Sequence, residues 1–233
     1  MTLTVHHLGV SQSDRVVWLC EELGIEYNLK KYDRAPILSP DEYKALHPLG
    51  AAPVIEDGHV ELAESSACVE YICQIYGKGR FVVAPGQKNY ADYLYWFHFV
   101  NGTLTPALSR TLALSLAGLG KDNDTLKRYD DKLKQILGFV DERLSKVPWL
   151  AGEEITAADI TIVCCLTSMR SFYPYDLGEY KNILAYLKRI SERDGYRRAV
   201  QKGDPDLDID KLTGAAPPPM QKGLAAALQA RGK

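Results

Sequence analysis

The segment Ser11-Gln12-Ser13-Asp14-Arg15-Val16-Val17-Trp18 decides how the fold begins, because it joins a short apolar strand to an amphipathic helix. Residues 3–8 predict the strand, and residues 14–23 carry apolar side chains at helical spacing up to Gly24, a typical helix stop. Such a junction exposes unpaired backbone N–H groups and the positive end of the helix dipole, so it can hold an anion. The turn lacks the glycine-rich spacing of a phosphate-binding loop, which favours a thiolate as that anion.

The first third of the chain continues the alternation of strands and helices. After the first helix, the sequence predicts strands at 25–32, 53–56 and 60–62, a short helix beginning at 39–42, and a longer helix at 64–76. Asp57-Gly58 between the last two strands is a strong hairpin signal. The order β-α-β-α-β-β-α predicts a mixed four-stranded sheet covered by helices, in an α+β domain.

From residue 90 onward the pattern is helical. The predicted helices lie at 90–119, at 126–144, around Leu187 and Ile190, and after Gly195. Gly102 and Pro106 within the first of them predict one bent helix or two stacked helices. We therefore predict four parts: a domain at 1–78, a linker at 79–89, an all-α bundle at 90–213 and a C-terminal extension at 214–233. Pro217-Pro218-Pro219 and its surroundings predict that the extension is mobile.

The strongest local signal in the second half is Ile155-Thr156-Ala157-Ala158-Asp159-Ile160. Thr156 can accept from the backbone N–H of Asp159 while the Asp159 carboxylate accepts from the Thr156 N–H, which is a capping box. The residues that follow are apolar nearly all round, so this helix is expected to run through the middle of the bundle. Asp159 is predicted to be structural rather than catalytic.

Composition excludes several classes of function. The 233 residues carry a net charge of -2 with no basic run, which argues against a nucleic-acid partner. No apolar stretch approaches the roughly 20 residues that span a bilayer, and no secretory leader opens the chain, so we predict no membrane partner and a cytoplasmic location. The five cysteines include no C-x-x-C pair and are expected to be reduced, and the scattered histidines give no metal-ligand pattern. A small organic ligand without a metal is the expectation.

Three motifs, taken in order, resemble the glutathione transferase family. They are Ser11 four residues before Arg15, the run from His47 to Val54 (HPLGAAPV), and the run from Leu62 to Ala67 (LAESSA). The resemblance covers residues 3–202, and the segment from Trp96 to Pro106 is similar to the yeast and bacterial type. It implies a thioredoxin-like domain followed by an all-helical domain, assembled as a homodimer. It also implies glutathione as co-substrate, a small hydrophobic electrophile as second substrate, and peroxide reduction as a second activity.

The same resemblance assigns roles to residues of the first domain. Pro53 matches the family's cis-proline, so the backbone of Ala52 would pair with the cysteinyl part of glutathione. Ser65 and the N-terminus of its helix would bind the γ-glutamyl carboxylate, and Glu64 would pair with the ammonium group. A plain helix cap is the alternative role of Glu64 and Ser65. Arg15 is placed with the substrate-binding residues through its motif.

Ser11 matches the position of the family's serine hydroxyl that donates to the glutathione sulfur. Such a hydrogen bond favours the thiolate, as does the helix dipole. Ser13 remains an alternative, because it is itself a natural helix cap. No cysteine lies near Ser11, which disfavours disulfide exchange through an enzyme thiol.

The chain departs from the family at Ala51, where many relatives carry Lys, Arg or Gln for the glycyl carboxylate of glutathione. Lys44 or His47 could take over that contact, and a structural role is equally open for His47. The departure and the tail also allow a non-catalytic glutathione-binding module for regulation or assembly. A glutathione-dependent pathway lyase or isomerase is a further alternative.

The second substrate is expected between the domains, against the first long helix of the bundle. Tyr95, Phe99 and Thr103 share one face of a regular helix, and the cluster Phe172-Tyr173-Tyr175 follows the central helix. Aromatic stripes of this kind more often belong to the core than to a pocket. Tyr95, Phe99 and Thr103 are the candidates for the lining of the second-substrate pocket.

Overall fold

The computed structural model describes residues 2–119 and 122–231, and its first part is a four-stranded sheet. The strands are β1 (Thr4–Leu8), β2 (Asn28–Tyr32), β3 (Val54–Asp57) and β4 (Val60–Ala63). They lie in the order β2-β1-β3-β4, with β1 and β2 parallel and the other two pairs antiparallel. This mixed sheet confirms the thioredoxin-like architecture expected for the N-terminal part.

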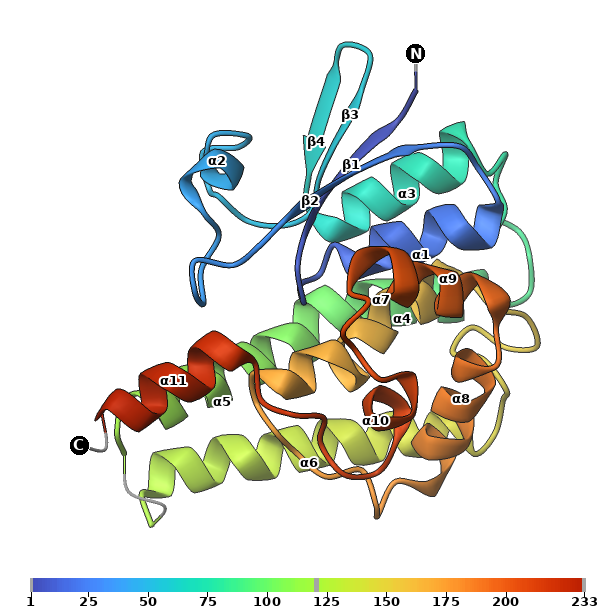
Figure 1. The fold of residues 1–233 in the computed structure, drawn as a ribbon. Coiled ribbons are helices and arrows are strands. Elements are labelled where there is room, and N and C mark those ends of the chain that lie inside the picture. The colour runs from blue at the N-terminus through green and yellow to red at the C-terminus, as the bar shows by residue number, and fades with distance from the viewer. Residues whose placement is uncertain (1, 120–121, 232–233) are drawn as a thin grey trace.

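Helices make up most of the remaining chain (Figure 1). The helices and helical turns are α1 (Asp14–Leu23), α2 (Asp41–Lys44), α3 (Ser65–Ile75), α4 (Tyr90–Phe99), the π-helical turn η1 (Val100–Leu104), α5 (Thr105–Leu116), α6 (Asp124–Leu144), α7 (Ala157–Leu166), the 3-10 turn η2 (Ser168–Ser171), α8 (Lys181–Ser191), α9 (Asp194–Gly203), α10 (Ile209–Thr213) and α11 (Lys222–Arg231). The all-helical C-terminal part is therefore confirmed. Met1, residues 120–121 and the last two residues of the predicted extension lie outside the described residues.

Alternation along β1 and β3 sends side chains to two faces of the sheet. Val5 and Ile55 face α1 and α3, which lie side by side in Figure 1, whereas Leu8 and Val54 pack with Tyr43 of α2. Because successive side chains of a strand point to opposite faces, His6 and His7 also separate. His7 lies on the side of the sheet that faces α1.

The first helix of the bundle is continuous through a π-helical turn. Gly102 lies inside η1, and Pro106 follows at the start of α5. The wider turn leaves the proline, which has no N–H to donate, at a position where a helical hydrogen bond is not needed. The segment is therefore one continuous helix rather than two stacked helices.

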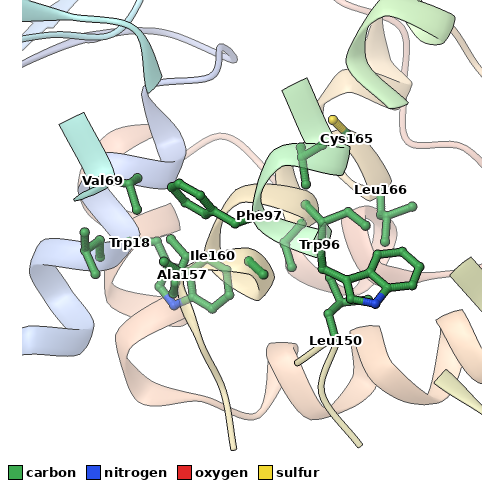
Figure 2. Packing of buried hydrophobic residues seen from close by; sticks show 14 of the residues in the cluster. Trp18, Val69, Trp96, Phe97, Leu150, Ala157, Ile160, Cys165 and Leu166 are labelled. Carbon is green, nitrogen blue, oxygen red and sulfur yellow. The ribbon is translucent and has the colours of Figure 1, made fainter. Parts of the chain in front are cut away.

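One hydrophobic core joins the sheet domain to the bundle. In Figure 2, Trp18 of α1 and Val69 of α3 approach Phe97 of α4 together with Ala157 and Ile160 of α7. A core that both parts share fixes the position of the β1–α1 loop against the bundle. The exact domain bounds, including the linker at 79–89, stay predictions.

The capping box at the start of α7 is confirmed. The Thr156 N–H donates to Asp159 Oδ2 at 2.8 Å, and the box is complete in both directions. Asp159 Oδ1 also accepts from the Leu150 N–H at 2.9 Å and from the Tyr186 hydroxyl at 3.1 Å. This buried carboxylate therefore ties α7 to α8 and to the loop before α7.

The tail departs from the sequence prediction. Composition predicts a mobile extension from Gly214, but the structure packs this segment against the bundle. The buried Arg170 guanidinium donates to the carbonyl oxygens of Gly214 and Ala215 at 2.9 and 2.6 Å. Composition alone could not reveal a buried arginine whose donors need these carbonyl groups.

The start of α11 is held by two further segments. The Gln221 N–H donates to Ser171 O at 2.8 Å, and the Gln221 side-chain amide donates to Pro36 O at 3.2 Å. Leu224 of α11 is buried. The tail therefore lies between η2 and the segment that follows β2.

Replacing Arg170 with alanine is expected to release the tail, because the carbonyl groups lose their donors and a cavity opens beneath them. Tryptic cleavage after Lys222, whose side chain is exposed, should become at least several-fold faster in the variant. Arg110→Ala on the exposed face of α5 is the matched control. Equal cleavage rates in the wild type and in Arg170→Ala would show that the guanidinium does not hold the tail.

All five cysteines are free and buried, as expected for reduced thiols. Within residues 2–119 and 122–231, no helix combines the length and the hydropathy that a bilayer crossing requires.

Candidate functional site

The loop between β1 and α1 presents two serine hydroxyls with different surroundings. Ser11 Oγ accepts from the Ser13 N–H at 3.2 Å and lies 2.7 Å from Ser13 Oγ. Ser13 Oγ in turn lies 2.8 Å from His7 Nδ1 and accepts from the Leu8 N–H at 3.2 Å. Ser13 has no exposed surface, whereas Ser11 keeps 7%. Ser11 is thus the less buried residue of the pair, and Ser13 does not cap α1 with its side chain.

Two charged side chains fix the backbone of this loop. Val10 has a φ of 50°, an unfavourable conformation for a β-branched residue. Its N–H donates to Asp204 Oδ1 at 3.0 Å, and Arg34 donates to the carbonyl oxygens of Gly9 and Val10 at 2.7 and 2.8 Å. These contacts hold the loop that presents Ser11 in one conformation.

Pro53 lies at the same edge of the sheet as this loop. The peptide bond between Ala52 and Pro53 is cis, which confirms the expectation drawn from the family resemblance. Because β1 and β3 are antiparallel and pair His6 with Val54, the loop that follows β1 lies near the residues that precede β3. The backbone of Ala52 is therefore on the Ser11 side of the sheet.

The start of α3 carries the second predicted pair. Glu64 has a φ of 71° and makes no side-chain cap, so the plain-cap alternative does not describe its side chain. Ser65 is buried, and its hydroxyl donates to Gln12 Oε1 at 3.1 Å and accepts from Arg15 Nη1 at 2.7 Å. An unusual backbone conformation at an exposed acidic residue is typical of a functional position.

A buried guanidinium connects α1, α3 and the π-helical turn. Arg15 Nη1 donates to Gln12 Oε1 and Asn101 Oδ1, both at 2.9 Å, as well as to Ser65. Asn101 Nδ2 donates onward to Ser66 Oγ at 2.9 Å. Across the described part of the chain, no carboxylate lies within ion-pair distance of Arg15, so its charge is available to attract an anion at the start of α3.

Two residues of the predicted aromatic face, Tyr95 and Phe99, pack with a ring of α6. Tyr95 is 53% exposed and stacks on Phe99, with ring centroids 5.9 Å apart. Both rings contact Phe139 of α6. The regular-helix spacing that joined them to Thr103 fails because η1 is a π-helical turn with more residues per turn. Thr103 itself lies half-buried in η1.

The aromatic cluster after α7 is divided among different surroundings. The Arg34 guanidinium lies 4.8 Å from the centroid of the Phe172 ring, so Phe172 is close to the Ser11 loop. The Tyr173 hydroxyl donates to Asp130, and the Tyr175 hydroxyl donates to Cys165 O at 2.6 Å. The two tyrosines therefore serve packing within the bundle.

Lys44 and His47 lie in and after α2. Lys44 Nζ pairs with Asp41 Oδ1 at 2.8 Å on the surface, and this contact lowers the pKa of Asp41. His47 Nδ1 accepts from the Leu49 N–H at 3.4 Å. Both side chains are free to turn toward a ligand at Ala51. Their contact with the glycyl carboxylate of glutathione stays a prediction.

A groove of about 960 Å³ opens beside the Ser11 loop. Its walls come from the segment after β2 and from the tail, and include Val10, Arg34, Pro36, Pro218 and Met220. That volume is large enough for a small organic molecule.

Sequence reasoning missed four residues that the structure brings to this region. They are His7, Gln12, Asn101 and Asp204. Strand alternation could have placed His7 on the α1 side, and the spacing of Gln12 and Arg15 suits one helical face. No sequence motif near Asp204 predicts its contact with the β1–α1 loop. That contact depends on the packing of α9 on α1.

Comparisons with known proteins agree with this architecture. The family model described as glutathione S-transferase, N-terminal domain matches residues 11–75, and the C-terminal domain model matches residues 96–194. Glutathione S-transferase 3 of Schizosaccharomyces pombe is 28% identical over 240 residues, which cover 94% of this chain and 98% of that relative.

Solved structures show the same likeness. A glutathione S-transferase from Actinobacillus pleuropneumoniae has a TM-score of 0.80 and 31% identity, covering 90% of this chain and 96% of the other. Glutathione transferase URE2P6 from Phanerochaete chrysosporium, solved with oxidized glutathione, has a TM-score of 0.73 and 23% identity, covering 88% of this chain and 97% of the other, and shares the fold. With a thioredoxin-like sheet, a cis-proline at its edge and both domain models matched, the chain belongs to the glutathione S-transferase family of enzymes.

Proposed function

We propose that this enzyme ionises the thiol of glutathione at Ser11 and adds the thiolate to a hydrophobic electrophile. The observation that carries the proposal is the position of the Ser11 hydroxyl, the less buried member of a serine pair at the N-terminus of α1. A hydroxyl donor and a helix N-terminus both favour a bound anion over the neutral thiol.

The energetic requirement on this site is modest. A free thiol with a pKa of about 8.5 is roughly 3% ionised at pH 7, and lowering that pKa by about two units makes most of it thiolate. Such a shift corresponds to roughly 2.7 kcal/mol. Because nucleophilicity falls as the thiol pKa falls, the gain in reactivity is only several-fold. Positioning of the electrophile therefore supplies much of the remaining rate.

The rest of glutathione is proposed to lie along the edge of the sheet. The Ala52 backbone before cis-Pro53 would pair with the cysteinyl unit, and the start of α3 would receive the γ-glutamyl group. There, Glu64 is exposed to pair with an ammonium, while Ser65 and the Arg15 charge behind it favour a carboxylate.

The glycyl end requires a different partner from that of many relatives, since Ala51 offers no charge. Lys44 and His47 are the candidates for its carboxylate. The α2 ion pair of Lys44 with Asp41 is exposed, so it costs little free energy to break.

The electrophile is proposed to bind in the groove beside the Ser11 loop rather than against Tyr95 and Phe99. A hydroperoxide is a second substrate class that a glutathione thiolate could reduce. The rings of Tyr95 and Phe139, 53% and 45% exposed, support a homodimer contact on α4 and α6. We propose a cytoplasmic location for the enzyme.

Conjugation of glutathione to a chloronitroaromatic, together with reduction of an organic hydroperoxide, tests the proposal. Formation of the conjugate is the expected result. Retention on immobilised glutathione with no turnover of either substrate would instead favour a non-catalytic binding module, which Ala51 motivates. Turnover that requires glutathione without consuming it would favour a lyase or isomerase.

A further inference from the structure

A chain of hydrogen-bonding groups leads from a buried histidine to Ser11, which reaches the surface. His7 Nε2 lies 3.1 Å from Asp204 Oδ2, and His7 Nδ1 lies 2.8 Å from Ser13 Oγ. Ser13 Oγ is 2.7 Å from Ser11 Oγ. His7 and Ser13 in the middle of the chain are fully or almost fully buried, whereas Ser11 at one end keeps 7% exposure and the Asp204 side chain at the other end keeps 14%. Ser11 is the end that lies at the N-terminus of α1, where the thiolate is proposed to bind.

We propose that His7 takes up the thiol proton of bound glutathione through Ser13 and Ser11, while Asp204 holds the imidazole in the tautomer that can accept it. This inference rests on the proposed function, because it requires the glutathione sulfur at Ser11. Ser11 is the catalytic residue of this hydrogen-bonded chain. His7, Ser13 and Asp204 act through it and are positioning residues.

Before the thiol ionises, every donor in the chain points inward. The Asp204 carboxylate accepts from His7 Nε2–H, which leaves Nδ1 free to accept the Ser13 hydroxyl proton. His7 Nδ1, 2.8 Å from Ser13 Oγ, is a nearer acceptor for that proton than Leu8 O at 3.3 Å. Ser13 Oγ can then accept both from the Leu8 N–H, 3.2 Å away, and from the Ser11 hydroxyl. Ser11 Oγ accepts from the Ser13 N–H, and its second lone pair is left for the thiol.

Ionisation reverses the direction of both hydroxyl groups. The S–H bond breaks and its proton goes to Ser11 Oγ, the Ser11 proton goes to Ser13 Oγ, and the Ser13 proton goes to His7 Nδ1. Each serine gives up one proton and gains one, so the products are a thiolate and an imidazolium. The Ser11 hydroxyl then points at the sulfur and donates to the thiolate. The chain that removes the proton therefore also stabilises the product.

The surroundings of His7 fix its ring and supply the balancing charge. A Cβ at Gly203 would lie 3.1 Å from His7 Nε2, so the end of α9 packs closely on the ring. Burial raises the pKa of Asp14, which accepts from Ser168 Oγ at 2.6 Å. Asp204, whose Oδ2 lies 3.1 Å from His7 Nε2, is the carboxylate that pairs with an imidazolium. The ionisable groups that line a cavity together with His7 on the α1 side are Asp14, Arg15, Cys164, Tyr196 and Asp204. The groove on the other side of His7 is lined by Lys31, Tyr32, Asp33, Arg34, Asp206, Asp208 and Lys211.

The test measures the pKa of glutathione bound to wild type, His7→Gln, Ser13→Ala and Asp204→Asn, from the ultraviolet absorbance of the thiolate across pH. In each variant the pKa of the bound thiol should rise by about one unit or more, a loss of about tenfold in the thiolate equilibrium. Asp204→Asn keeps an oxygen for the Val10 N–H, but its amide donates to His7 Nε2. The proton then resides on Nδ1, which can no longer accept from Ser13.

His6→Gln is the matched control, because His6 lies on the same strand and faces away from the chain. His6 Nδ1 lies 2.9 Å from the Tyr32 hydroxyl, and its ring has no contact with Ser13 in the described residues. The pKa of the bound thiol should be unchanged in this variant. Thermal unfolding and the glutathione Kd establish that each variant is folded and loaded.

A second readout uses the wild-type enzyme alone. Nitrogen-15 NMR of the histidine rings should show His7 protonated on both nitrogens when glutathione is bound as thiolate, and on Nε2 alone without glutathione. A neutral His7 beside an ionised thiol would overturn the inference. So would an unchanged thiol pKa in His7→Gln and Ser13→Ala while Ser11→Ala raises it. If Ser11→Ala leaves that pKa unchanged as well, the proposed function fails with it.

Discussion

Replacement of Ser11 by alanine is expected to lower kcat/KM for conjugation of a chloronitroaromatic by tenfold or more, with glutathione still bound. The variant loses the only hydroxyl of the serine pair that has exposed surface, and with it the donor to the sulfur. The bound thiol then ionises less at neutral pH, so activity should recover as pH rises toward the pKa of free glutathione, about 8.5. Initial rates at several pH values, with glutathione affinity from calorimetry, measure both effects.

Ser145→Ala provides the matched control, since Ser145 is an exposed serine at the end of α6 whose hydroxyl donates only to the neighbouring Glu142 carbonyl at 2.7 Å. Its kcat/KM should equal that of the wild type. Unchanged turnover in Ser11→Ala would remove Ser11 from the chemistry and reopen the search for the donor to the thiolate.

Asp159→Ala should be the most destabilising single substitution considered. It leaves the backbone N–H groups of Leu150 and Thr156 and the Tyr186 hydroxyl without their shared acceptor in the interior. Each buried donor left unpaired costs about 1–3 kcal/mol, so the free energy of unfolding should fall by about 3–5 kcal/mol. For a protein of this size the Tm should then fall by about 10 °C. Thermal unfolding followed by circular dichroism measures the change.

An exposed aspartate of the same bundle serves as the comparison. Asp131 is 75% exposed in its side chain and lies 3.7 Å from Lys134 one turn away. Asp131→Ala should change stability by no more than about 0.5 kcal/mol. If both variants unfolded at the same temperature, the capping box would not be the anchor of α7.

Much of the fold could be predicted because its signals are local. The hairpin at Asp57-Gly58, the capping box at Thr156 and Asp159, and the glycine stop after α1 each act within a few residues. The family resemblance supplied the cis bond before Pro53, which spacing alone could not.

The missed features depend on contacts between distant segments or on a change of helix type. Asp204 meets His7 across 197 positions of sequence, so no local pattern connects them. Asn101 lies in the π-helical turn η1, where the spacing of a regular helix does not hold, and it accepts from Arg15. The start of the tail is held by Arg170, which donates to a carbonyl oxygen of Gly214. Amino-acid composition does not reveal such a contact.

In a crystal structure of the enzyme with bound glutathione, the sulfur should lie within hydrogen-bonding distance of Ser11 Oγ, with the γ-glutamyl carboxylate at Ser65 and the start of α3. A sulfur bound away from the β1–α1 loop, or in contact with apolar side chains alone, would contradict the assignment of Ser11 as the donor to the thiolate.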